Sequence, residues 1–447
     1  MSNGQLLIIG GNAAGMSAAS QARRVEADID ITVVEQSPYI STAHCGLPYY
    51  ISGEIKDINS LTARTKEYFE DKRNVKVLTM TKALRIVSSS KSVETLDLRS
   101  GTKAALSYSR LIIAAGGDAV QPYSGKYIFS LRNTQDGLSL KKFIDSSHPM
   151  NAAVIGGGMI GLEMASSFRK LGMKVTVFEG SPAILPGFDT EISAPVERYL
   201  AGHDIKIIKS KASASDSASG GVDVSAGGRS HHYDMALIAL GTKAAAQLAG
   251  AAGCELGAAG GVRTNLKMQT SIPSIYAAGD CVEVKNLISG KNVYIPLGTT
   301  ANKTGRVAGI NAAGGDAVFH GIIASAAGNI LNMTVARTGL SEEEAGDGFG
   351  EIASVISESA SRADYYPGGS KITSKLIFSK TSGQLLGAQM MGKEGVAKRI
   401  DILAVCIQQK MKLRDIAGLD LTYAPPEAPV WDPVLKAVNT ALLKLRK

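Results

Sequence analysis

Two stretches decide the fold: QLLIIGGNAAG at residues 5–15 and NAAVIGGGMIG at residues 151–161. In each, an apolar strand runs into a glycine-rich turn, and a helix of small residues follows. A second apolar strand then ends in an acidic residue, Glu35 in the first unit and Glu179 in the second. This order is typical of a dinucleotide-binding unit, so the chain is predicted to contain two of them.

The glycine turns indicate where pyrophosphates bind. A phosphate approaches the backbone closely only where no Cβ intrudes, and the following helix offers free N–H groups. The acidic residue then accepts a hydrogen bond from a ribose hydroxyl. The second turn has all three glycines, whereas Asn12 replaces the middle one in the first. The candidate residues are Gly10, Gly11, Ala14, Gly15 and Glu35 in the first unit, and Gly156, Gly158, Ile160, Gly161 and Glu179 in the second.

Each unit is followed by an apolar strand that ends in small residues, YSRLIIAAGG at 108–117 and HHYDMALIALGT at 231–242. Ala115, Gly116 and Gly241 stand at these strand ends and are further candidates for cofactor contacts. After about residue 325 the glycine pattern stops, and strands such as KITSKLIFS flank helical stretches. We therefore expect an α/β protein with two Rossmann-like domains and a C-terminal α+β domain.

Composition excludes several classes of protein. The net charge is +8, but the basic residues are spread along 447 residues without a dense run, so no nucleic-acid partner is expected. No apolar run approaches the ~18 residues of a membrane helix. The four cysteines lie far apart, so neither a disulfide framework nor a metal site is predicted. With no leader-like segment before the first strand, we expect a cytoplasmic enzyme.

Cys45 is the candidate redox residue, in the segment STAHCGLPYY at 41–50. Pro48 is typical of the first turn of a helix, which would place Cys45 at a helix N-terminus and lower the pKa of its thiol. His44 beside it has two interpretations. It either holds an imidazolium that lowers the pKa further, or it only fills space.

The strand TSIPSIYAAGD at 270–280 resembles the one that returns to the FAD domain in pyridine nucleotide-disulfide oxidoreductases. The resemblance covers essentially the whole chain. It implies an FAD domain in two parts (1–118 and 246–324), an NAD(P) domain (119–245) and a dimerisation domain (325–447). It also implies that Asp280 and Ala301 contact FAD, and that Glu163 lies near the meeting point of nicotinamide and flavin.

The cysteine segment resembles the single-cysteine branch of that superfamily. Tyr50 stands where dithiol members carry their second cysteine, and the C-terminal domain has no histidine. HCGLPYY at 44–50 is similar to the NCGLPYY of coenzyme A-disulfide reductases, with His44 in place of the usual asparagine. Ala13 occupies the position of the catalytic histidine of NADH peroxidases. Within the single-cysteine branch, the sequence therefore resembles coenzyme A-disulfide reductases, persulfide reductases and NADH oxidases.

Two C-terminal segments, YYPG at 365–368 and YAPP at 423–426, match family segments whose tyrosines reach the partner subunit's cysteine. The resemblance therefore implies a homodimer with Tyr365 and Tyr423 as catalytic residues. Because adjacent strand residues point to opposite faces, only one of Tyr365 and Tyr366 can serve. Glu427-Ala428 and Met159 depart from the family pattern.

The resemblance further implies that Ser41, Arg24 and Arg73 bind a substrate derived from coenzyme A, whose phosphates require cations. Glu179 would repel a 2′-phosphate, so NADH is expected over NADPH. The predicted reaction is NADH-driven reduction of coenzyme A disulfide, or of a related disulfide or persulfide, through FAD and Cys45. Two alternatives stay open: an NADH oxidase that reduces O₂ through a Cys45 sulfenic acid, and a redox-sensing flavoprotein with little turnover.

Overall fold

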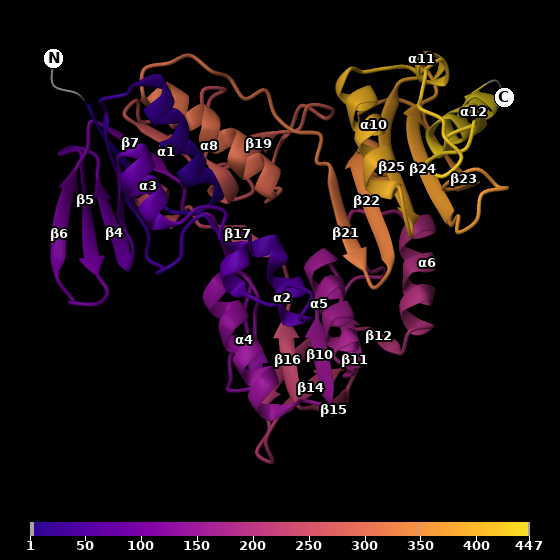
Figure 1. The fold of residues 1–447 in the computed structure, drawn as a ribbon, viewed down its shortest axis with the longest axis horizontal. Coiled ribbons are helices and arrows are strands. Elements are labelled where there is room, and N and C mark those ends of the chain that lie inside the picture. The colour runs from indigo at the N-terminus through magenta and orange to yellow at the C-terminus, as the bar shows by residue number, and fades with distance from the viewer. Residues whose placement is uncertain (1–3, 347, 446–447) are drawn as a thin grey trace.

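The computed structural model describes residues 4–346 and 348–445. Figure 1 shows three lobes, with the N-terminal one on the left, the middle of the chain below and the C-terminal one on the right. None of the helices in the described ranges combines the length and apolar character needed to cross a membrane.

The first lobe is built on a parallel sheet in the order β18-β7-β1-β2-β3. Its strands are β1 (Gln5–Ile9), β2 (Asp30–Val34), β3 (Val75–Leu78), β7 (Arg110–Ile113) and β18 (Ile275–Ala277). Strand β18 follows the second glycine unit in sequence, yet it pairs with β7. The chain therefore returns to its first sheet.

Several helices and a small sheet complete this lobe. They are α1 (Ala13–Val25), α3 (Lys66–Arg73), α7 (Gln247–Ala251), α8 (Gly298–Ala312) and the meander β4 (Thr81–Val87), β5 (Ser92–Asp97) and β6 (Lys103–Ser107). Helix α2 (Leu47–Ile51) comes early in the chain but lies against the second lobe, where Ile51 is part of the apolar core (Figure 1). A short hairpin, β19 (Val284–Lys285) with β20 (Asn292–Val293), precedes α8. Helices α1 and α8 pack closely, because a Cβ on Gly305 would lie 2.2 Å from the Ala14 carbonyl oxygen.

The second lobe repeats the design around the sheet β12-β11-β10-β16-β9. Its parts are β9 (Ile128–Phe129), α4 (Thr134–Ser147), β10 (Asn151–Ile155), α5 (Met159–Lys170), β11 (Lys174–Glu179), α6 (Thr190–Ala201), β12 (Ile205–Lys209) and β16 (Met235–Ile238). A meander, β13 (Ala212–Asp216), β14 (Val222–Ala226) and β15 (Arg229–Tyr233), joins β12 to β16. The Ser- and Gly-rich stretch at 210–221 forms β13 and the turn that follows it.

The chain crosses between these lobes twice, and the two crossings pair with each other. Strand β8 (Gly117–Ala119) runs antiparallel to β17 (Thr242–Ala244). This pairing supports domain boundaries near residues 118 and 245, and those boundaries remain our proposal.

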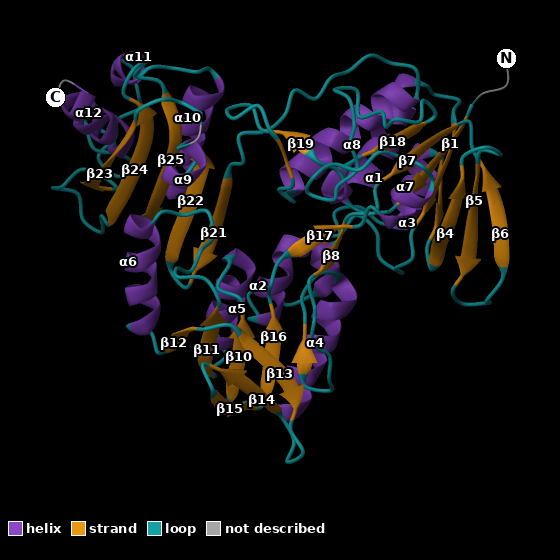
Figure 2. Cartoon of the chain, turned by 180° about the vertical axis from the view of Figure 1, so that it is seen from behind, coloured by secondary structure: helices purple, strands orange, loops and turns teal. Residues whose placement is uncertain are grey.

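The third lobe is an antiparallel sheet in the order β21-β22-β25-β24-β23. Its strands are β21 (Ala326–Ile330), β22 (Met333–Gly339), β23 (Ile352–Ala360), β24 (Lys371–Ser379) and β25 (Leu385–Gly392). Helix α10 (Val396–Gln408) packs on β22 and β25, and α12 (Pro433–Leu445) packs on β23 and β24. The short helix α9 (Glu342–Ala345) packs over the sheet, with Ala345 buried against residues of β24 and β25, and α11 (Leu413–Ala417) packs against α12 (Figure 2). The predicted α/β architecture with a C-terminal α+β domain is confirmed.

The third lobe is joined to the second by strand β21, which packs against α5. A Cβ on Gly328 would lie 2.0 Å from the Met159 sulfur, and the Leu331 N–H donates to the Ser166 hydroxyl at 3.0 Å. Ile330 is fully buried in the apolar core of the second lobe. The C-terminal sheet thus directly supports the helix that follows the second glycine turn.

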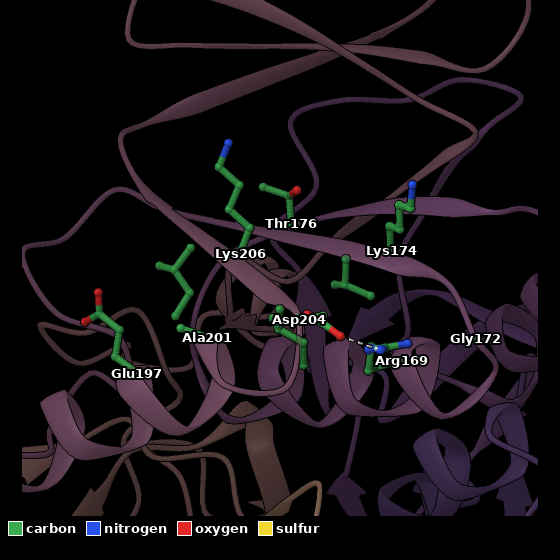
Figure 3. A pocket seen from close by; sticks show the side chains of 11 residues that line it. Arg169, Gly172, Lys174, Thr176, Glu197, Ala201, Asp204 and Lys206 are labelled. Carbon is green, nitrogen blue, oxygen red and sulfur yellow. Dashed lines mark hydrogen bonds and ion pairs between the residues drawn. The ribbon is translucent and has the colours of Figure 1, made fainter.

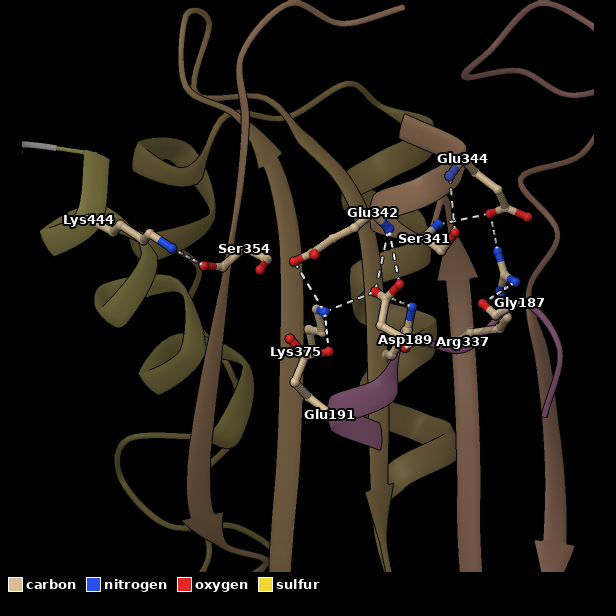
Figure 4. Close-up of polar contacts among 11 residues, drawn as sticks. Gly187, Asp189, Glu191, Arg337, Ser341, Glu342, Glu344, Ser354, Lys375 and Lys444 are labelled. Carbon is tan, nitrogen blue, oxygen red and sulfur yellow. Dashed lines mark hydrogen bonds and ion pairs between the residues drawn. The ribbon is translucent and has the colours of Figure 1, made fainter. Parts of the chain in front are cut away.

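A buried ionic cluster forms a second junction between these lobes (Figure 4). The Lys375 side chain on β24 has no exposed surface, and its ammonium lies 2.6 Å from Glu191, 3.2 Å from Asp189 and 3.1 Å from Glu342. Gln389 adds a hydrogen bond of 2.8 Å to Asp189. Asp189 and Glu191 begin α6, so one cation from the third lobe neutralises carboxylates from the second.

Replacing this cation should destabilise the protein strongly. In Lys375→Met the three carboxylates lose their shared partner, which should cost about 3–5 kcal/mol of folding free energy. Thermal unfolding followed by circular dichroism measures the loss as a lower Tm. The matched control is Lys371→Met on the same strand, where an exposed pair with Glu358 contributes at most about 1 kcal/mol. Equal Tm values for the two variants would contradict the assignment.

Candidate active site

The two glycine turns share one backbone geometry. Gly10 has a φ of +106° and Gly156 one of +115°, a region that side chains disfavour. One helical turn on, a Cβ on Gly15 would lie 1.8 Å from the Gly10 carbonyl oxygen, and one on Gly161 would lie 2.0 Å from that of Gly156. These four glycines therefore let each helix start directly against its strand.

The two acidic residues close the turns in the same way. Glu35 accepts from the Gly11 N–H at 2.7 Å, and Glu179 accepts from the Gly157 N–H at 2.7 Å. Each also accepts from the N–H two residues further along, again at 2.7 Å. Both carboxylates are thus fixed beside their turns. A carboxylate has four lone-pair positions, so each keeps capacity for a ribose hydroxyl.

The turns fit dinucleotides because they leave room and free donors. Gly158 has an ordinary φ of −74° and no atom within 4 Å of where its Cβ would be, so packing does not require a glycine there. Helices α1, α5 and α8 all begin without a side-chain hydrogen bond to cap them. Ala301 lies in the first turn of α8 and is buried. Such free N–H groups are suited to phosphate and other anionic groups.

Cys45 lies in a short 3₁₀ turn, His44–Gly46, that leads into α2. It is exposed, whereas Cys254, Cys281 and Cys406 are buried. The segment is tied to the second lobe, since the Ser167 hydroxyl donates to the Pro48 carbonyl at 2.9 Å. Cys45 is therefore the one accessible thiol among the described residues, at the junction of the two dinucleotide-binding lobes.

The prediction of a lowered Cys45 pKa is wrong. Although Cys45 is accessible, the surrounding chain partly desolvates its sulfur, which raises the pKa of the thiol; the carboxylates of Glu163 and Asp280 raise it further, and Arg132 opposes them. The following helix α2 has only five residues, so its dipole is small. Desolvation of the thiol, followed by charges from distant parts of the chain, outweighs the effect of the local helix end on the pKa.

The imidazolium interpretation of His44 is also wrong. Burial lowers the pKa of His44 to about 4, and Arg132 contributes in the same direction. The ring is therefore neutral near pH 7. The Asn12 amide nitrogen lies 3.2 Å from each ring nitrogen, and its amide oxygen accepts from the Thr42 N–H at 2.8 Å. Asn12, the missing glycine of the first turn, thus supports the histidine that fills the space before Cys45.

Two carboxyl groups and one guanidinium complete the surroundings of the thiol. Glu163 lies on α5, accepts from the Asn329 N–H at 3.3 Å and has a pKa raised by burial. Asp280 lies in a short turn, Gly279–Cys281, directly after β18. Its carboxylate pairs with Arg132 at 2.7 Å. The structure thus places Glu163 and Asp280 where their charges act on Cys45, next to His44, and the roles assigned to these residues remain predictions.

The two candidate tyrosines meet each other. The hydroxyls of Tyr365 and Tyr423 lie 2.6 Å apart across 58 residues of sequence, and both side chains are exposed. Tyr365 lies in a turn between β23 and β24, so the argument from alternating strand faces is wrong, although it is Tyr365 that pairs with Tyr423. In the described part of the chain, their hydroxyls bond to each other and not to the Cys45 thiol.

Of the residues predicted to bind substrate, Ser41 contacts the first glycine turn, whereas Arg24 and Arg73 lie at the C-terminal end of α1. The Ser41 N–H donates to the Gly11 carbonyl at 2.8 Å. Arg24 lies exposed on α1. Arg73 ends α3 and donates to the Tyr68 hydroxyl at 3.1 Å, while its own carbonyl accepts from Arg23 on α1. The two basic candidates therefore stand on neighbouring helices.

A cavity of about 920 Å³ lies elsewhere on the second lobe (Figure 3). It is lined at the end of α5 and the starts of β11 and β12, where Arg169 pairs with Asp204 at 2.8 Å. The glycine turn lies at the opposite ends of β10 and α5. This cavity is therefore not the dinucleotide site.

The sequence did not reveal the roles of three residues that organise the site. Arg132 pairs with Asp280, Ser167 holds the cysteine segment and Asn12 supports His44. Arg132 directly precedes a helix-capping pair, Asn133 with Asp136, which marks a helix start and nothing more. Its partner Asp280 is 148 residues away. No local pattern connects these residues, so only the fold reveals them.

Comparison with known proteins gives the family. A model of the pyridine nucleotide-disulphide oxidoreductases matches residues 4–305, and the model of the dimerisation domain of these enzymes matches residues 325–433. The chain belongs to this family. The enzymes of this family use FAD and a pyridine nucleotide, in agreement with the two turns described above. The structure and sequence of this oxidoreductase confirm the predicted resemblance.

Several relatives match over almost their full length. An "NADH oxidase" of Methanocaldococcus jannaschii is 36% identical, with 98% of this chain and 99% of that protein aligned. A CoA-dependent "NAD(P)H sulfur oxidoreductase" of Pyrococcus abyssi is 33% identical, covering 96% of each. Among solved structures, an NAD-dependent persulfide reductase from A. fulgidus superposes with a TM-score of 0.95 at 37% identity, covering 98% of this oxidoreductase and 83% of that chain.

Removing the His44 ring should not change the ionisation of the Cys45 thiol, because the ring carries no charge near pH 7. In His44→Asn, the rate of Cys45 alkylation by iodoacetamide between pH 5 and 8 should keep its pH dependence, because a ring with a pKa of about 4 is already neutral there. If the His44 ring were charged, its removal would shift the pKa of the Cys45 thiol by about 1–3 units. Alkylation sites are assigned by mass spectrometry. A shift of that size in the variant would contradict the neutral assignment.

Proposed function

We propose that this oxidoreductase uses NADH to reduce coenzyme A disulfide, or a related disulfide or persulfide, through Cys45. The observation that carries the proposal is the lone accessible thiol at the junction of the two dinucleotide-binding lobes. The other three cysteines are buried, so Cys45 has no second accessible thiol among the described residues. Relatives named as CoA-dependent sulfur oxidoreductases and coenzyme A disulfide reductases support the substrate class.

The chemistry balances with one thiol. The Cys45 thiolate attacks one sulfur of the substrate disulfide, a new S–S bond forms, and the other sulfur leaves as a thiolate that takes up a proton. FAD, which the first glycine turn and Asp280 would hold, would supply the two electrons of NADH that cleave the mixed disulfide. Cys45 returns to the thiolate and the second thiol is released. Each turnover consumes one NADH, one disulfide and one proton, and yields two thiols.

We infer that the tyrosine pair of a partner subunit protonates the leaving thiolate. A buried hydrogen-bonded phenol is a suitable general acid near a thiolate. Tyr365 and Tyr423 are exposed in this chain, as are Val430 and Trp431 of the same domain. An apolar surface of this kind on a dimerisation domain supports a homodimer.

The nucleotide preference and the substrate contacts follow from charge. Glu179 is held by two backbone N–H groups beside the second turn, where a 2′-phosphate would meet a carboxylate. This favours NADH. Arg24 and Arg73 lie on neighbouring helices at the C-terminal end of α1 and offer cations to the phosphates of a coenzyme A derivative. Four unpaired cysteines among the described residues support a reducing compartment, which we take to be the cytoplasm.

A second candidate is reduction of O₂ by NADH, with Cys45 passing through a sulfenic acid. The name of the relative from Methanocaldococcus jannaschii favours it. The same thiol serves both reactions, so the acceptor decides between them.

The first test identifies what Cys45 carries and which acceptor it serves. Mass spectrometry of the denatured protein should find coenzyme A on Cys45. NADH turnover should be at least about tenfold faster with coenzyme A disulfide or persulfide than with O₂, and NADPH should be the poorer donor by a similar factor. Cys45→Ser should lose about 10³-fold or more of this activity. Cys254→Ser, at a buried thiol bonded to Thr270, should keep it. Faster O₂ reduction without an adduct would establish the oxidase instead.

The second test asks whether the tyrosines act across subunits. Tyr365→Phe/Tyr423→Phe should lower kcat with coenzyme A disulfide by about 10²-fold, the usual range for a lost general acid. Mixing this variant with inactive Cys45→Ser and exchanging subunits creates hybrid dimers with one complete site. Activity should then recover toward a quarter of the wild-type value. Two inactive variants that stay inactive after verified exchange would show that the site lies within one chain.

A further inference from the structure

Arg132 occupies a central position that no motif assigns. It lies in the loop between β9 and α4, at the start of the second lobe. Its backbone N–H donates to Asp136 at 2.8 Å, which fixes the loop to the first turn of α4. From there the side chain extends across the junction to the first lobe.

The guanidinium makes two well-formed contacts there. Nε donates to the Gly117 carbonyl at 2.8 Å, and a terminal nitrogen pairs with Asp280 at 2.7 Å. The side chains of this pair are only 29% and 16% exposed. Gly117 begins the first crossing between the lobes, and Asp280 ends the returning strand. One side chain of the second lobe thus contacts both the first crossing and the turn that follows β18.

The charges around Cys45 explain what such a cation does. Carboxylates face the thiol from two elements, Glu163 from α5 and Asp280 from the turn after β18. Arg132 is the cation that opposes them, while neighbouring His44 is neutral and the Tyr49 phenol has a raised pKa. Ionising the thiol adds a third negative charge to this group.

We propose that Arg132 is a positioning residue for the redox thiol: its guanidinium fixes the Asp280 carboxylate and compensates the charge of the Cys45 thiolate. Without it, two uncompensated carboxylates would face the sulfur, and the thiolate needed for attack on a disulfide would be less populated at neutral pH. This inference builds on the proposed function, since it assigns a role in forming the nucleophile.

The test measures ionisation of Cys45 without any acceptor. In the reduced, FAD-loaded protein, the rate of alkylation by iodoacetamide is followed from pH 6 to 10 and assigned to Cys45 by mass spectrometry. Arg132→Gln should slow alkylation at pH 8 by about three- to tenfold and move the midpoint upward by a corresponding 0.5–1 unit. Arg132→Lys keeps the charge and should stay within about twofold of the wild type.

The control variant is Arg85→Gln, which removes an exposed arginine paired with Glu94 on the β4–β6 meander. It should leave the pH profile of Cys45 alkylation unchanged. A purely structural brace would lower the Tm of Arg132→Gln but leave its alkylation midpoint at the wild-type value, which would overturn the proposal. If Arg132→Gln does not fold, a midpoint raised by a full unit in Arg132→Lys overturns it equally. Because no disulfide substrate is used, the result is independent of which acceptor the enzyme reduces.

Discussion

The contact between α1 and α8 is the constraint on which the rest of the active site depends. Gly305 and Gly309 have no room for a Cβ, because either one would lie 2.2 Å from a carbonyl oxygen of α1. These glycines allow the chain that returns after the second lobe to lie directly against the first glycine turn. That return delivers β18 to its place beside β7, and with it Asp280. Larger residues on α8 would separate the two parts of the chain that form the first lobe.

The thiol lies where several parts of the fold meet, and its chemistry reflects all of them. The 3₁₀ turn of Cys45 belongs to the first lobe, Glu163 and Arg132 to the second, and Asp280 to the returning segment. The ionisation of one sulfur is therefore set by the relative placement of these segments. Residues that carry no chemistry of their own, such as Ser167 and Asn12, maintain that placement through hydrogen bonds to the cysteine segment.

Local patterns were sufficient to predict the two glycine turns, the strands that end in Glu35 and Glu179, and the C-terminal domain, because each is encoded within about thirty residues. The charge state of His44 and the pKa of Cys45 could not be predicted in this way. They depend on burial and on carboxylates more than a hundred residues away. The Tyr365–Tyr423 pair was predicted through its resemblance to a family pattern, while the strand argument offered for it failed because the segment is a turn.

The packing of β21 on α5 has a thermodynamic consequence. Gly328 contacts Met159 at the start of the helix, and the Asn329 N–H donates to Glu163. A nucleotide at the second glycine turn and a partner on the C-terminal sheet therefore act on the same strand and helix. Linkage makes any such coupling reciprocal: by whatever factor the nucleotide changes the association of subunits, association changes the affinity for the nucleotide.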